Sequence, residues 1–200
     1  MFTKAFRPLL AAAAICVLAA PAVGQGFSDS YQFIQAVKER DGAKVESLLA
    51  TPGTMVNTRD RDTGNSAIHI VTLDRNPTWM RYLVGKGARV DAQNDKGETA
   101  LTLASQMGWF DGVQTLLNLR ANVDLANGRG ETPLILAVQK RDLPLVRLLL
   151  ASGADPRKND RVAGLSALDY AKRDGRSPAI VKMLEDTKVT PKREVAGPSF

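Results

Sequence analysis

The sequence predicts an all-α solenoid of about five helix-turn-helix units, stacked side by side and joined by extended segments. Two repeated phrases indicate it. The first begins with glycine and recurs after 33 or 34 residues, as GNSAIHIV (64–71), GETALTLA (97–104), GETPLILA (130–137) and GLSALDYA (164–171). The second is rich in leucine, as in LVRLLLASGADP at 145–156, and has counterparts at 79–91 and 112–124.

The clearest unit contains the start and stop signals of two helices. Thr132 suits an N-cap, and Pro133 suits the first helical position, where a missing N–H has no consequence. The second helix begins near Pro144, presents a broad apolar face over 145–150 and ends where Gly153 allows a left-handed residue. Asn76-Pro77 and Ser177-Pro178 are further cap-and-proline pairs that start second helices.

Such helix pairs are apolar on both flanks and cannot bury these faces alone, so each unit requires neighbours. Small side chains recur at one register of the first helices and allow close packing; they are Val71, Ala104, Ala137 and Ala171. The terminal units carry more charge, which suits the ends of a stack. Lys38 and Glu39 lie in the first unit and Lys172 and Arg173 in the last.

The glycine-threonine-proline-leucine entry, the alanine three residues later, the leucine triplet and the Gly-Ala-Asp ending resemble the ankyrin repeat. The resemblance covers residues 28–187. It implies an ankyrin solenoid with repeats at about 28–58, 61–93, 94–126, 127–160 and 161–187, joined by β-hairpin fingers. It also implies a non-catalytic module that binds another protein.

Both ends of the chain are expected to lie outside the repeats. Lys4 and Arg7 precede a short apolar run and then PAVGQG, an order typical of a secretory signal peptide over residues 1–24. Cleavage after Ala22 and cleavage after Gly24 both fit the pattern. An uncleaved membrane anchor is the alternative, disfavoured by the shortness of the apolar run. Residues 188–200 are polar, contain two prolines and predict a disordered tail.

Composition narrows the possible partners. The sole cysteine, Cys16, lies in the predicted leader, so the cleaved chain would contain neither a thiol nor a disulfide. The leader contains two of the 27 basic residues and none of the 21 acidic ones, so its removal lowers the net charge from +6 to +4. These scattered charges favour an acidic partner weakly and do not resemble a nucleic-acid footprint. We expect a bacterial periplasmic protein, monomeric and without stable membrane insertion.

No residue pattern predicts a catalytic, metal or cofactor site. His69 is the sole histidine, and a lone histidine without cysteine cannot build a zinc site. The ankyrin resemblance implies that it bridges adjacent hairpins. A catalytic pair with Ser66 is the alternative, disfavoured because Ser66 is itself a helix cap. The segment 91–102 lacks the glutamate that a calcium loop needs at its twelfth position.

The resemblance implies that the fingers and the exposed edges of the first helices line a concave binding surface. We predict partner-binding residues there, with a solvated charged face as the alternative. On the fingers they are Arg61, Asp62, Asn94, Lys96, Arg129, Lys158 and Arg161; on the first helices they are Leu73, Asp74, Gln106, Met107, Gln139, Lys140 and Arg173. Trp109 opens a second helix and would be an anchor if exposed; partial packing against the neighbouring loop is the alternative.

The predicted function is that of an interaction module in the cell envelope whose partner is another exported protein. One alternative is a structural protein held to an anionic envelope polymer by its net charge. Another is an enzyme or small-ligand binder that uses His69.

Overall fold

The computed structural model describes residues 25–50 and 56–187, which form ten helices. The predicted leader (1–24) and the predicted tail (188–200) lie outside these residues. The helices are α1 (Gln25–Glu39), α2 (Gly42–Ala50), α3 (Ala67–Leu73), α4 (Pro77–Gly85), α5 (Ala100–Gln106), α6 (Phe110–Asn118), α7 (Pro133–Gln139), α8 (Leu143–Ala151), α9 (Ala167–Asp174) and α10 (Pro178–Asp186).

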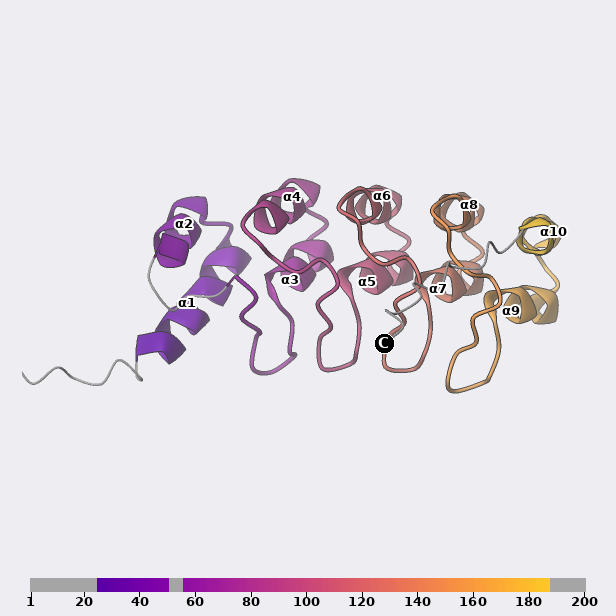
Figure 1. Ribbon diagram of the computed structural model, residues 1–200, viewed down its shortest axis with the longest axis horizontal. Coiled ribbons are helices and arrows are strands. Elements are labelled where there is room, and N and C mark those ends of the chain that lie inside the picture. Colours follow the sequence, from indigo (N-terminus) through magenta and orange to yellow (C-terminus); the bar gives the residue numbers. More distant parts are fainter. Residues whose placement is uncertain (1–24, 51–55, 188–200) are drawn as a thin grey trace, which may run out of the picture.

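The helices form two parallel rows (Figure 1). The first helix of each pair (α1, α3, α5, α7 and α9) lies in one row, and the second helices lie in the other. Long loops at 57–65, 90–98, 123–131 and 156–165 extend beyond the row of first helices, away from the second helices. We call these loops the fingers. The predicted all-α solenoid is confirmed. No helix within the described residues is long and apolar enough to cross a membrane.

The helix caps and the glycine stop predicted from the sequence are present in the structure. The hydroxyl of Thr132 accepts the N–H of Ile135, and the carboxylate of Asp142 caps α8 by accepting the N–H of Leu145. Gly153, just after α8, has φ of +89°, a conformation that glycine adopts without steric penalty. At 7–9 residues most of these helices are too short to be stable in isolation, so their stability depends on tertiary packing.

Packing between neighbouring units supplies that stability. Each central first helix packs against the first helices before and after it, as α5 does against α3 and α7. In the second helices, fully buried side chains recur at the repeat spacing and form a continuous apolar row. They are Met80, Val113, Val146 and Ile180, with Leu83, Leu116 and Leu149 one turn later. A terminal unit has a neighbour on one side only.

The turn of each finger is held by one side-chain oxygen, which accepts hydrogen bonds from backbone N–H groups of the same finger. These side chains are Asp60, Asn94, Asn127 and Asp160. Such turns suit short polar side chains. Backbone hydrogen bonds close the hairpins, as when the N–H of Asn94 donates to Glu98 O at 3.0 Å. The described residues contain no regular strand, only one isolated bridge between Arg59 and Ser66.

Neighbouring fingers are joined at their tips. The N–H of Gly128 donates to Lys96 O at 2.9 Å, and the N–H of Arg161 donates to Arg129 O at 2.9 Å. A Cβ atom on Gly97 would lie 2.6 Å from the nitrogen of Gly128, so only glycine permits this approach. A Cβ atom on Gly130 would likewise lie 2.5 Å from the nitrogen of Arg161, so these two glycines allow neighbouring fingers to approach closely.

Carboxylates at the base of the fingers make a second set of links. Asp91 accepts the N–H of Asn122 at 2.9 Å, and Asp124 accepts the N–H of Asp155 at 2.9 Å. Both aspartates occupy the same place in their repeats and both bind the backbone of the next repeat. This role explains their recurrence without a metal ion.

We expect Leu149→Ala to lower the free energy of unfolding by about 2–5 kcal/mol, because it removes a buried side chain between stacked units. Urea denaturation followed by circular dichroism measures the change. The matched control is Leu73→Ala, since the Leu73 side chain is 47% exposed and makes little buried contact. Equal losses in the two variants would contradict the stacking arrangement.

Candidate functional site

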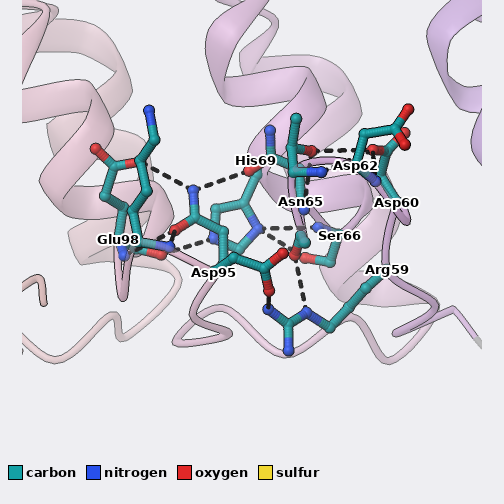
Figure 2. A network of polar contacts seen from close by, with 12 residues as sticks. Arg59, Asp60, Asp62, Asn65, Ser66, His69, Asp95 and Glu98 are labelled. Atoms are coloured by element: carbon teal, nitrogen blue, oxygen red, sulfur yellow. Dashed lines mark hydrogen bonds and ion pairs between the residues drawn. The ribbon is translucent and has the colours of Figure 1, made fainter.

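His69 joins two consecutive repeats (Figure 2). Its Nδ1 lies 2.9 Å from Ser66 Oγ and accepts the N–H of Ser66 at 3.2 Å. Its Nε2 lies 2.9 Å from Glu98 O, in the next finger. Nδ1 accepts a backbone N–H and Nε2 faces a carbonyl, so the compatible form is the neutral imidazole with its proton on Nε2. The bridging role implied by the ankyrin resemblance is what the geometry shows.

Burial makes the charged form of His69 unfavourable. The side chain is fully inaccessible to solvent, and burial lowers the pKa of the imidazole, although the carbonyl of Glu98 opposes the shift and Arg59 adds to it. Arg59 is held nearby by hydrogen bonds to Gly64 O at 2.8 Å and to Asp95 Oδ1 at 2.6 Å. Both ring nitrogens are occupied, so the proposed use of His69 as a catalytic base has no geometric support.

A shallow hollow brings together four of the predicted partner-binding residues. It lies on the finger side of α5, α7 and α9, and its lining includes Leu136, Glu131 and Tyr170. The predicted residues that line it are Gln106, Arg129, Gln139 and Lys140. We call this the central hollow.

A second hollow lies next to it, between α7 and α9. Gln139 and Tyr170 line both hollows, so the two are adjacent. Predicted Arg173 lines the second hollow, together with Arg141 and Arg176. Across the two hollows the lining includes five cations (Arg129, Lys140, Arg141, Arg173 and Arg176) and two carboxylates (Glu131 and Asp174). The combined surface is therefore electropositive and favours an acidic partner.

Tyr170 is fixed where the two hollows meet. Its hydroxyl donates to Asp160 Oδ2 at 2.5 Å, and the pKa of the phenol is raised, first by this hydrogen bond and then by burial. The guanidinium of Arg173 lies 5.1 Å from the centre of the Tyr170 ring. The ring therefore supports an arginine at the edge of the surface.

The remaining predicted residues lie elsewhere or have structural roles. Arg61 and Asp62 line a separate hollow beside α1, near Tyr31, which is 66% exposed. Asn94 is buried, and its amide and carbonyl groups build the finger turn, so it is not an open binding residue. Lys158 donates to Asp124 O at 2.7 Å and lines another hollow with Arg161.

Of four further predicted positions, Leu73, Asp74 and Met107 lie at the ends of first helices and Lys96 lies in a finger. Leu73 and Lys96 are exposed, and Met107 is half-buried. Asp74 pairs with Arg40 of the preceding unit, their nearest atoms being 3.5 Å apart. None of these four residues lines the central hollow.

Trp109 is half-buried rather than an exposed anchor. It packs against the core, and a Cβ atom on Gly112 would lie 2.1 Å from its ring carbon Cε3. The ring therefore lies across the glycine one turn further along α6. The alternative of partial packing describes it better. Phe110, next to it, is 38% exposed and was not anticipated from the sequence.

Four arginines adopt left-handed backbone conformations: Arg40, Arg75, Arg120 and Arg141. At the place of Arg75 and Arg141, other repeats have Gly108 and Gly175, both with positive φ. A left-handed conformation costs a non-glycine residue about 1–2 kcal/mol. A surface ion pair returns only about 0–1 kcal/mol, so pairing alone does not offset this cost. Arginine at a glycine place of the repeat is the sequence signal that would have drawn attention to Arg141.

No group of three or more histidine, cysteine, aspartate or glutamate side chains within residues 25–50 and 56–187 is arranged to hold a metal ion.

Comparison with known proteins identifies the fold family. A family model described as ankyrin repeats, in three copies, matches residues 33–127 and again residues 111–193. The chain belongs to the ankyrin repeat family. Ankyrin repeats are generally non-catalytic and indicate a protein–protein interaction module.

The similar curated proteins share a short part of this ankyrin array. A 59-residue stretch is 48% identical to human palmitoyltransferase ZDHHC17, and a 60-residue stretch is 38% identical to the fowlpox virus ankyrin repeat protein FPV240. Each stretch is 30% of this chain and covers 9% or 14% of the relative. The chain thus spans about a tenth of the length of the curated relatives it matches.

We expect the stability of the ankyrin array to fall as pH is lowered from 7 to 5. The pKa of His69 is lowered in the folded state, so below about pH 6.5 the unfolded chain binds the additional proton. The loss from this residue reaches at most about 2 kcal/mol at pH 5. Urea denaturation at each pH measures it.

The control for that experiment is His69→Thr, because Thr102 occupies the same place in the next repeat and caps its helix. This variant loses the link to Glu98 O and should be about 1–3 kcal/mol less stable at pH 7. Its stability should be nearly flat between pH 5 and 7. An unchanged pH dependence in the variant would refute the assignment to His69.

We expect Arg75→Gly to raise the free energy of unfolding by about 0.5–1 kcal/mol, because glycine relieves the left-handed strain. Arg75→Ala is the matched control, since it removes the side chain and retains the strain. Thermal or urea denaturation compares the two. A glycine variant no more stable than the alanine variant would show that the backbone at this place is unstrained.

Proposed function

We propose that this chain binds an exported protein in the bacterial cell envelope through the central hollow, the fingers and the exposed ends of the first helices. The observation that carries the proposal is the gathering of Gln106, Arg129, Gln139 and Lys140 around one hollow on the finger side. These side chains come from two successive repeats, and all four are exposed rather than part of the buried row that stacks the array.

The partner's surface should be acidic where it meets the array. The lining of the two adjacent hollows has more cations than carboxylates, and Leu136 and Tyr170 supply apolar contact between the charges. Electrostatic complementarity accelerates association and excludes cationic partners. Location in the envelope rests on the order of charged, apolar and small residues at the start of the sequence.

Photo-crosslinking in cells that produce the protein tests the face and the location together. A photoreactive residue replaces Gln106 or Lys140 on the finger side, or Arg81 or Arg147 on the exposed side of the second helices as controls. We expect one partner protein to be crosslinked from Gln106 and from Lys140, and no protein from the two control positions. In the crosslinked adduct, the ankyrin repeat protein should be periplasmic and should begin at Val23 or Gln25.

A second step tests the electrostatic part with the protein so identified. Lys140→Glu should raise the dissociation constant for that partner at least about tenfold, which corresponds to 1.4 kcal/mol of binding free energy. Arg147→Glu should leave the dissociation constant unchanged. Adducts from Arg81 and Arg147, or a full-length chain in the cytoplasm, would contradict the proposal. An adduct with envelope polymer alone would favour the structural alternative.

A further inference from the structure

Three arginines surround one carboxylate at the end of the electropositive surface. Arg141 follows α7, Arg173 and Asp174 end α9, and Arg176 follows in the turn to α10. All four line the hollow beside Tyr170. We call them the Asp174 cluster.

The carboxylate of Asp174 forms ion pairs with two of the arginines. Arg141 Nε lies 3.1 Å from Asp174 Oδ2, while Arg176 reaches Asp174 Oδ1 at 3.0 Å through both Nε and Nη2. The side chain of Asp174 is 27% exposed, compared with 43% for Arg141 and 68% for Arg176. The carboxylate thus lies beneath guanidinium groups that remain open to solvent.

Asp174 is ionised at neutral pH, so the cluster has two positive charges in excess. Partial burial on its own would raise the pKa of this carboxyl, but the hydrogen bond from Arg176 and the charges of Arg141 and Arg176 outweigh it and lower the pKa. The third cation, Arg173, lies over the ring of Tyr170 and makes a cation–π contact with it instead of an ion pair with Asp174.

The arginines have donors left for a ligand. A guanidinium has five N–H donors in a planar fork that matches the two oxygens of a carboxylate. Arg141 contacts Asp174 through Nε, and its guanidinium has two terminal amino groups as further donors. A partner carboxylate that enters the hollow would meet these amino groups and the guanidinium of Arg173.

Stacking of the repeats does not require this cluster. At the other end of the array a single arginine, Arg40, contacts Asp74 at the corresponding place, with a distance of 3.5 Å. Of the two repeats between these ends, one has Arg75 at that place and the other has Gly108. Arg141 also keeps a left-handed backbone with φ of 57°, which glycine would adopt without strain.

We propose that the Asp174 cluster receives a carboxylate of the protein partner and so fixes the position of that partner along the array. This inference rests on the proposed function, since the cluster's hollow lies next to the central hollow and shares Gln139 and Tyr170 with it. The carboxylate belongs to an acidic side chain or to the partner's C-terminus, two sources of the same chemistry.

The test is a titration of the full chain followed by NMR of the arginine Nε–H signals. The first probe is acetyl-hexaglutamate with an amidated C-terminus, and acetyl-hexaglutamine with a free C-terminus is the second. Amidated acetyl-hexaglutamine and inorganic phosphate are the controls. We expect saturable shifts of the Arg141 and Arg173 signals with one of the two carboxylate probes, which identifies the source.

Matched variants separate the cluster from general charge. In Arg141→Gln combined with Arg173→Gln, the half-saturating concentration should rise at least about tenfold, as expected for two lost charge-assisted hydrogen bonds. Arg40→Gln removes one cation from the opposite end and should leave it unchanged. The backbone amide spectrum verifies that each variant is folded.

Several results would overturn the inference: no saturable shift with either probe, equal competition by phosphate, or equal weakening in Arg40→Gln. These results are distinguishable from failure of the proposed function. A crosslinked partner that binds the double variant with undiminished affinity refutes the cluster and leaves the finger-side assignment intact. Crosslinks from the second helices refute the finger-side assignment, while the hexaglutamate titration still reports on the cluster.

Discussion

The stacking of apolar helix faces between neighbouring repeats is the interaction on which the structure depends. Most helices have 7–9 residues and could not persist alone. The buried row of Met80, Val113, Val146 and Ile180 exists only because each unit covers the next. Everything on the surface of the array, including the fingers and both hollows, is positioned by this row.

The fingers form a polar surface whose regular spacing follows from the stacking of the repeats. Tip-to-tip hydrogen bonds such as Gly128 to Lys96, together with the His69 bridge to Glu98, hold each finger to the next through backbone groups. These links use main-chain atoms or side chains at recurring places. The other finger and helix-end positions can therefore vary in charge without disturbing the frame, and Arg129 and Lys140 are examples.

Features that depend on local chemistry could be predicted from the sequence. Thr132 as a cap and Gly153 as a helix stop follow from single residues and their neighbours. The bridging role of His69 came from family resemblance. The Asp174 cluster was missed because Arg141 and Asp174 are 33 residues apart and meet only when repeats stack. Trp109 could not be placed because its exposure depends on packing over Gly112.

Amide hydrogen exchange on the full chain tests most directly whether stability comes from neighbouring repeats. If stacking dominates, protection should be greatest in α3 to α8, whose units have neighbours on both sides, and should decline toward α2 and α10. Uniform protection along the array, or greatest protection in a terminal unit, would contradict the account.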